Sequence, residues 1–307
     1  MSNRLMEAVK KEKDLDWQQD FMDKARGNAF YKRVMKEGVL SDMSQALGQV
    51  YDVAVEAATK MQVARDIIWF MPTKQPTQRF YLAKRGAVTR VGETGGLQIG
   101  ERFSKVDIDL DYEYVYNAAY TQSYIEDVPF DVLRRAIADG GQLLEEKLTS
   151  DVMVLYESVA AGSLAGAAEI TAKTAGTLAW ADLVAAWTAL NKESWKADVC
   201  IVHPDQYQDL WNDDKFIHSY YFGDAADVAR GILGSTYLGF KIVVTDLCTT
   251  AQCHMLASRE AAACLMRRDI MTQPYEIPDE LREGVLLSRR YGLGTLKTTA
   301  IARIVSC

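Results

Sequence analysis

The stretch RVGETGGLQIGE, residues 90–101, holds four glycines in twelve residues and is a candidate phosphate-binding loop. A Walker-type loop needs a Lys and a Ser or Thr directly after its last glycine, and a dinucleotide fingerprint needs G-x-G-x-x-G at the start of a helix. The glycines match neither spacing, and a strand-like segment follows Gly92, Gly95, Gly96 and Gly100. Because glycine tolerates the backbone angles of a bending loop, the stretch instead predicts the flexible tip of a hairpin.

An acidic run just after this stretch resembles half of a calcium site. Asp107, Asp109 and Asp111 reproduce the D-x-D-x-D start of a calcium loop. The loop then needs Gly and, at its twelfth position, Glu, but this chain has Tyr112 and Ala118 there. On a strand these carboxylates would lie ~7 Å apart on one face, which suits pairing with cations better than closing around one ion.

A second metal-like set consists of Cys248, Cys253, His254 and Cys264. Structural zinc sites favour short C-x₂₋₄-C turns, whereas a strand-like segment follows this cysteine pair, so free thiols are the better interpretation. The five cysteines of the chain are an odd number without a framework spacing, which also favours reduced thiols. The sequence therefore predicts no metal site and no cofactor.

His203 is the strongest candidate for acid–base catalysis. It lies at the end of a predicted strand, where active sites of α/β proteins often lie, and Asp205 or Asp246 could serve as its carboxylate partner. The chain has no G-x-S-x-G elbow, no H-E-x-x-H and no cysteine signature. A lone histidine is usually structural, so we expect no enzyme, and a soluble α/β enzyme using His203 stays an alternative.

Periodicity in the first half of the chain predicts the elements that position these residues. Residues 1–40 carry dense charge of both signs and predict an arm. Apolar residues at helical spacing predict a helix over 41–66. Strict alternation of apolar and acidic residues over 106–116 predicts one long strand with a buried face and a ladder of carboxylates. A cap signal and helical spacing predict a long helix over 129–159, with a bend or a stutter at Gly140–Gly141.

The second half of the chain predicts alternating helices and strands. A helix over 180–193 precedes a short buried strand over 199–203, and Pro204 opens another helix. Later strands are predicted at GFKIVVTD, CHMLAS, AACLMRR, GVLLSRRYG and KTTAIARIVS.

Charge is unevenly distributed along this acidic chain, whose net charge is −7. Residues 60–105 carry nine basic and three acidic side chains, whereas residues 106–158 carry three basic and twelve acidic ones. Adjacent blocks of opposite sign can steer subunits together. No apolar run approaches the ~20 residues that span a bilayer, and the charged start does not read as a signal peptide, so assembly in a cytosol without a membrane partner is expected.

Taken in order, these elements resemble the Hong Kong 97-type major capsid protein of tailed bacterial and archaeal viruses. The residues that carry the resemblance are TRVGETGGLQIGERFSKVDID for the extended loop, VPFDVLRRAIADGGQLLEEKLTSDVMVLYE for the spine helix, VCIVHPDQYQDLW with GSTYLGFKIVVTD for the axial domain, and GVLLSRRYGLGTLKTTAIARI for the return into the peripheral domain.

The resemblance implies an α+β fold with a defined order of parts. These are an N-terminal arm (1–40), a helix and connection into the peripheral domain (41–78), the extended loop (79–106), the peripheral domain (107–178) with spine helix 129–159, the axial domain (179–284) and the return strands of the peripheral domain (285–307).

The resemblance also implies a function. Copies of such a protein form pentamers and hexamers that close into an icosahedral shell around double-stranded DNA in the virion, and they are assembled in the host cytoplasm. Portal and scaffolding proteins are the implied partners. The acidic balance predicts that contact with the packaged DNA is weak and independent of sequence.

A projecting hairpin cannot reach its own acidic block, so its cations are expected to contact a neighbouring copy. The expected donors are Arg79, Lys84, Arg85 and Arg90, and the expected acceptors are Asp107, Asp109, Asp111, Glu113, Glu145 and Glu146. Some relatives weld their subunits by a Lys–Asn isopeptide bond, but this chain has no asparagine after Asn212, which predicts a non-covalent shell. An encapsulin, a cellular compartment with the same fold that encloses enzymes, is the nearest alternative.

Overall fold

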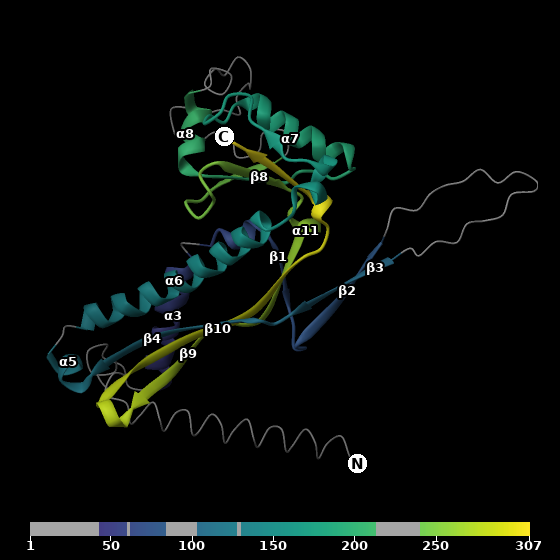
Figure 1. Ribbon diagram of the computed structural model, residues 1–307. Helices are drawn as coiled ribbons and strands as arrows, with labels where there is room; N and C mark the ends of the chain where they lie inside the picture. Colours follow the sequence, from purple (N-terminus) through teal and green to yellow (C-terminus); the bar gives the residue numbers. More distant parts are fainter. Residues whose placement is uncertain (1–42, 60–61, 84–102, 128–129, 213–239) are drawn as a thin grey trace, which may run out of the picture. The chain divides into compact units, whose positions relative to one another are not determined.

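The computed structural model of the chain describes residues 43–59, 62–83, 103–127, 130–212 and 240–307. These residues form an α+β fold with three sheets (Figure 1), which confirms the predicted fold class. Within these ranges, no helix combines the length and the apolar character that crossing a bilayer requires.

The described residues divide into two compact units. Unit 1 contains the described residues before 63 together with residues 113–148 and 268–290. Unit 2 contains the described residues of 63–112, 149–267 and 291–307.

One sheet has four strands in the order β1-β9-β10-β4, with β1 and β9 parallel. Its strands are β1 (Trp69–Pro72), β9 (Ala262–Ile277), β10 (Arg282–Thr295) and β4 (Tyr112–Thr121).

In unit 1, helix α3 packs against the long helix α6. Their bounds are α3 (Met43–Thr59) and α6 (Phe130–Glu157), and the short α5 (Gln122–Asp127) precedes α6. The core holds apolar side chains of α3, α5, α6, β9 and β10, namely Val50, Ala54, Ala58, Ile125, Ile137, Leu144, Ile270, Val285 and Leu287.

Helix α6 runs without interruption through Gly140–Gly141, where a bend or a stutter was expected. The glycines serve close packing instead. A Cβ at Gly141 would collide with the backbone carbonyl of Ala54 in α3, and one at Gly140 would collide with Tyr116 and Leu287. Helix axes approach this closely only where the contact position lacks a side chain.

The single long strand predicted over 106–116 is two strands. β3 (Phe103–Asp109) pairs with β2 (Thr77–Ala83) in a two-stranded sheet, whereas β4 belongs to the four-stranded sheet. The alternation of residue types continues through the break, so the pattern could not reveal that the chain changes sheets at residues 110–111.

Unit 2 contains a five-stranded sheet in the order β5-β11-β8-β6-β7. Its strands are β5 (Ile170–Thr171), β11 (Ile301–Val305), β8 (Gln252–Leu256), β6 (Val199–Val202) and β7 (Lys241–Val244). Helices α7 (Trp180–Lys192) and α8 (Pro204–Asn212) cover one face of the sheet with an apolar core (Figure 1). Two short helices complete the unit, α4 (Ala64–Ile67) and α11 (Ser258–Ala261).

Two buried side chains anchor the last turn of α6 within unit 2. The hydroxyl of Tyr156 donates to the carbonyl of Ile67 at 2.7 Å. The guanidinium of Arg303, on β11, donates to the carbonyls of Glu157 and Val159 at 2.7 and 2.8 Å. These bonds satisfy carbonyls that the end of a helix leaves without an intrahelical partner.

The ranges expected as an axial domain (179–284) and as return strands (285–307) each contribute strands to both of the larger sheets. β9 falls in the axial range but joins the four-stranded sheet, and β11 falls in the return range but joins the five-stranded sheet. The first four residues of β9 are buried and apolar, as are three of the five residues of β11, and such segments do not reveal which neighbour they pair with.

Candidate functional site

The β2–β3 hairpin presents one exposed face that holds several of the predicted contact residues. Antiparallel pairing sets Arg79 opposite Asp107, Thr77 opposite Asp109 and Tyr81 opposite Lys105. Exposed and partly buried residues alternate along both strands, so these side chains share a face. We call this the hairpin face, which consists of Thr77, Arg79, Tyr81, Phe103, Lys105, Asp107 and Asp109.

Arg79 and Asp107 bind each other across the hairpin. The guanidinium donates from Nε to Oδ1 at 2.7 Å and from Nη2 to Oδ2 at 2.9 Å, a bidentate pair. The hydrogen bond from Arg79 lowers the pKa of Asp107, and the same bond raises the pKa of Arg79. A predicted donor and a predicted acceptor of an inter-subunit contact are thus partners within one chain.

The described part of the hairpin face is electrically balanced, because it carries two cations, Arg79 and Lys105, and two carboxylates, Asp107 and Asp109. Asp109 also accepts a hydrogen bond from the hydroxyl of Thr77. The other expected donors, Lys84, Arg85 and Arg90, and the expected loop tip, Gly92, Gly95, Gly96 and Gly100, lie outside the described residues.

Two exposed aromatic residues on the hairpin face were missed in the sequence. Tyr81 is 61% exposed and Phe103 is 58% exposed. The register pairs Phe103 with Ala83, next to Tyr81 along the face. Alternate residues of a strand share a face, so the positions of Arg79 and Asp107 would have placed both rings on the hairpin face. Large exposed aromatic side chains are typical of protein–protein contacts.

The remaining expected acceptors lie apart from the hairpin face. Asp111 is exposed in the turn between β3 and β4, and Glu113 forms ion pairs with Arg268 and Arg290 in unit 1. Glu146 is partly buried on α6.

Glu145 is not on the surface, which corrects its expected role as an exposed acceptor. Its carboxylate accepts from Nη1 of Arg289 at 2.5 Å, and the two side chains are 1% and 0% exposed. Arg289 also pairs with the half-exposed Asp269, with 3.0 Å between Nη2 and Oδ1. The sequence could not reveal this pair, because its members lie 144 positions apart.

His203 caps helix α8. Its Nδ1 accepts from the backbone N–H of Asp205 at 3.2 Å, and its own N–H donates to Oε1 of Gln206 at 3.1 Å. The first turn of a helix needs acceptors of this kind for its unpaired N–H groups. The Asp205 carboxylate is 3.2 Å from the same ring nitrogen. This geometry gives the residue a structural role.

The four residues weighed as a zinc set do not converge. Cys253 and His254 are neighbours on β8 and point to opposite faces of the sheet. The sulfur of Cys253 lies 3.6 Å from that of Cys200 in the core beneath α7 and α8, and Cys264 is buried on β9. Of the four, only Cys248 and His254 lie close together, in a group that also contains Glu157.

No protein-family model and no curated protein sequence matches the chain. Solved structures do match it. The chain is similar to the capsid of cyanophage P-SCSP1u, with a TM-score of 0.61 and 14% identity over 80% of this chain and 88% of that chain. It is similar to a virus-like particle from Pyrococcus furiosus, with a TM-score of 0.57 and 13% identity over 84% and 98% of the two chains. It is also similar to the capsid of a native GTA particle, with a TM-score of 0.61 and 14% identity over 80% and 90%.

These matches cover most of each chain. The chain therefore has the Hong Kong 97-type capsid fold, as the order of its predicted elements implies.

Proposed function

We propose that the chain is a major capsid protein, which assembles as pentamers and hexamers into an icosahedral shell around double-stranded viral DNA. The observation that carries the proposal is the fold, which the chain shares with capsids and with a virus-like particle. In this proposal the protein has no catalytic role, is assembled in the host cytoplasm and works with portal and scaffolding proteins. Its contact with the DNA is non-specific, because the chain is acidic overall.

The hairpin supplies the contact between copies in this proposal. Tyr81 and Phe103 become buried against the next subunit, since exposed rings on a projecting strand pair contribute most when a partner covers them. Lys84, Arg85 and Arg90 add attraction to acids of that neighbour, Asp111 among them. Each exposed pair contributes only ~0–1 kcal/mol, so the shell depends on many repeats of the contact.

Assembly of the purified full-length chain tests the proposal. Electron microscopy and sedimentation should show closed particles of megadalton mass, and particles from infected cells should protect DNA from nuclease. After boiling under reducing conditions, the shells should run as a monomer on a denaturing gel, because the subunits are joined non-covalently. A small soluble oligomer under all assembly conditions, with or without co-expressed scaffold, would refute the proposal.

Charge reversal tests the contact separately from the fold. Lys84→Glu, Arg85→Glu and Arg90→Glu together should abolish shells while the circular dichroism and melting temperature of the subunit stay unchanged. The matched control reverses three exposed cations of unit 2, Lys173, Lys192 and Lys196. Normal shells from the hairpin variant, or equal loss in the control, would contradict the assigned contact.

A compartment of the encapsulin type is the second candidate, because the match to the virus-like particle from Pyrococcus furiosus covers 98% of that chain. The two candidates predict different contents. A viral shell contains DNA, whereas a compartment contains a cargo enzyme. Nuclease protection and mass spectrometry of native particles distinguish them.

A further inference from the structure

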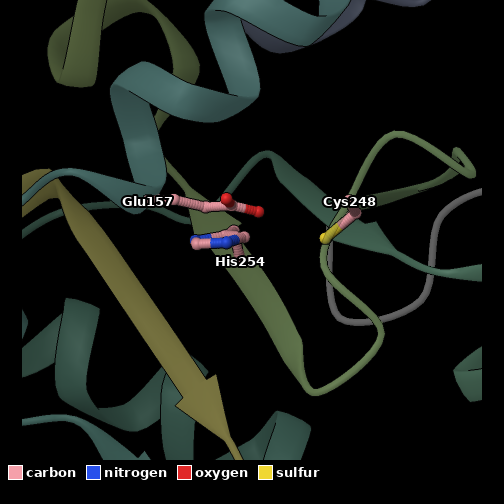
Figure 2. A group of neighbouring side chains, drawn as sticks. All are labelled: Glu157, Cys248 and His254. Atoms are coloured by element: carbon pink, nitrogen blue, oxygen red, sulfur yellow. The ribbon is translucent and has the colours of Figure 1, made fainter.

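Three side chains with metal-binding atoms meet in unit 2, away from the hairpin face. Glu157 is the last residue of α6, Cys248 lies between β7 and β8, and His254 lies on β8. One ligand atom from each lies within 4.8 Å of the other two. Figure 2 shows the imidazole ring beside the Glu157 carboxylate, with the Cys248 sulfur pointing toward both.

His254 is the most informative member of the group. The residue is 0% exposed, and neither Nδ1 nor Nε2 has a hydrogen-bond partner among the residues that the structure describes. A buried polar group without a partner typically costs about 1–3 kcal/mol, so it calls for a specific explanation. Burial and the charge of Arg303 lower the pKa of His254 to about 3. The imidazole nitrogens are the atoms through which this residue could bind a metal ion.

The other two members are held in place by hydrogen bonds. Oε1 of Glu157 accepts from the backbone N–H and the hydroxyl of Thr249 at 3.1 and 2.8 Å, which orients the carboxylate. The thiol of Cys248 donates to the carbonyl of Gln252 at 3.2 Å. Burial and the Glu157 charge raise the pKa of Cys248 to about 12.

We propose that Glu157, Cys248 and His254 form a zinc-binding site that ties the end of α6 to β8. Sulfur, nitrogen and carboxylate oxygen are the ligands that Zn²⁺ takes in proteins, whereas Mg²⁺ and Ca²⁺ prefer oxygen alone. On binding, the Cys248 thiol releases its proton to solvent as the Zn–S bond forms. Thiolate and carboxylate then supply two negative charges for the divalent ion.

The geometry needs only small side-chain rotations. Zn–N and Zn–O bonds of about 2.0 Å and a Zn–S bond of about 2.3 Å place tetrahedral ligands about 3.3–3.5 Å apart. The three atoms already lie within 4.8 Å of one another. A water molecule would take the fourth position. The proposal does not depend on shell formation, because all three residues belong to unit 2 of one chain.

Metal titration of the full-length chain tests the proposal. Stripped protein should take up one Zn²⁺ per chain, with a rise in melting temperature that increases with zinc concentration. Co²⁺ as a spectroscopic probe should give d–d bands of tetrahedral coordination and a sulfur-to-cobalt charge-transfer band. Cys248→Ser, His254→Gln and Glu157→Gln should each weaken binding at least about tenfold. The control is Cys307→Ser, which removes another buried thiol and should leave binding unchanged.

Several results would overturn the site. The first is a failure of the wild-type protein to bind zinc at micromolar concentration. This test does not depend on whether any variant folds. Another is a cobalt spectrum without the sulfur band, since it would exclude Cys248 as a ligand. Equal loss in Cys307→Ser, or full affinity in all three site variants, would assign the metal to other residues.

Discussion

Replacing Arg289 by Met should strongly destabilise the subunit. The two side chains of the Arg289–Glu145 pair are 0% and 1% exposed, with 2.5 Å between Nη1 and Oε2. Met keeps most of the length of the side chain but removes its charge. Glu145 would then lose the Arg289 guanidinium while its carboxylate stays buried, where water cannot compensate for the loss.

The size of the effect follows from what each partner loses. Breaking a buried ion pair by removing one member costs about 3–5 kcal/mol. Asp269, the second partner of Arg289, is 47% exposed and remains hydrated, so it should add little. Removing both charges with Glu145→Leu and Arg289→Met should recover most of the loss, because well-packed apolar residues replace buried ion pairs at little cost.

Denaturant unfolding of unassembled subunits at pH 7, followed by circular dichroism, measures these differences. The control is Arg282→Met, whose pair with Glu280 is more than half exposed on both sides and should change stability by less than about 1 kcal/mol. A loss below about 1 kcal/mol for Arg289→Met, or a double variant no more stable than the single, would refute the reasoning.

Three further changes test other parts of the structure. Gly141→Ala should lower the free energy of unfolding by about 1–3 kcal/mol, because its Cβ would collide with the backbone of α3. The control is Gly162→Ala, which has open space around it and should change the free energy of unfolding by less than about 0.5 kcal/mol. Denaturant unfolding measures both differences. Arg79→Gln should raise the lowered pKa of Asp107 toward 3.8, measured by NMR titration, since the hydrogen bond from Arg79 is the main cause of the shift. The small stabilisation from that bond is present above pH 3.8 and is lost as the pH falls through the lowered pKa, so an unchanged pKa in the variant would contradict the assignment. His203→Ala should cost about 0.5–2 kcal/mol through loss of the α8 cap, and His203→Asp should restore most of it; a thermal melt in which Ala and Asp behave alike would exclude the cap.

Much of the fold could be predicted from local patterns. The helical spacing that predicts 129–159 becomes α6, and the alternation over 106–116 keeps one exposed face on β3 and on β4. These predictions succeed because apolar residues that repeat every 3.6 or every 2 positions indicate which side of a helix or strand is buried. The alternation could not show that the chain changes sheets at residues 110–111, because the period of a strand does not specify which strand it pairs with.

The contact residues were only partly predictable for the same reason. The run of acids correctly marks an exposed ladder at Asp107 and Asp109. It could not show that Arg79 binds Asp107 across the hairpin, because that pair depends on the register of two strands. Exposed aromatic residues were overlooked because a Tyr or Phe in a strand reads as core until the facing direction is known.

Taken alone, the sequence determined the α+β class, the order of elements that resembles a Hong Kong 97-type shell protein, and the uneven charge along the chain. Only the tertiary structure decided that Glu145 meets Arg289, that Gly141 allows α6 to approach α3, and that Glu157 joins Cys248 and His254. Residues close in sequence share a local period, which the sequence displays directly. Residues far apart meet only when packing and the cost of leaving charges and polar groups unpaired select one arrangement, and no local pattern records that choice.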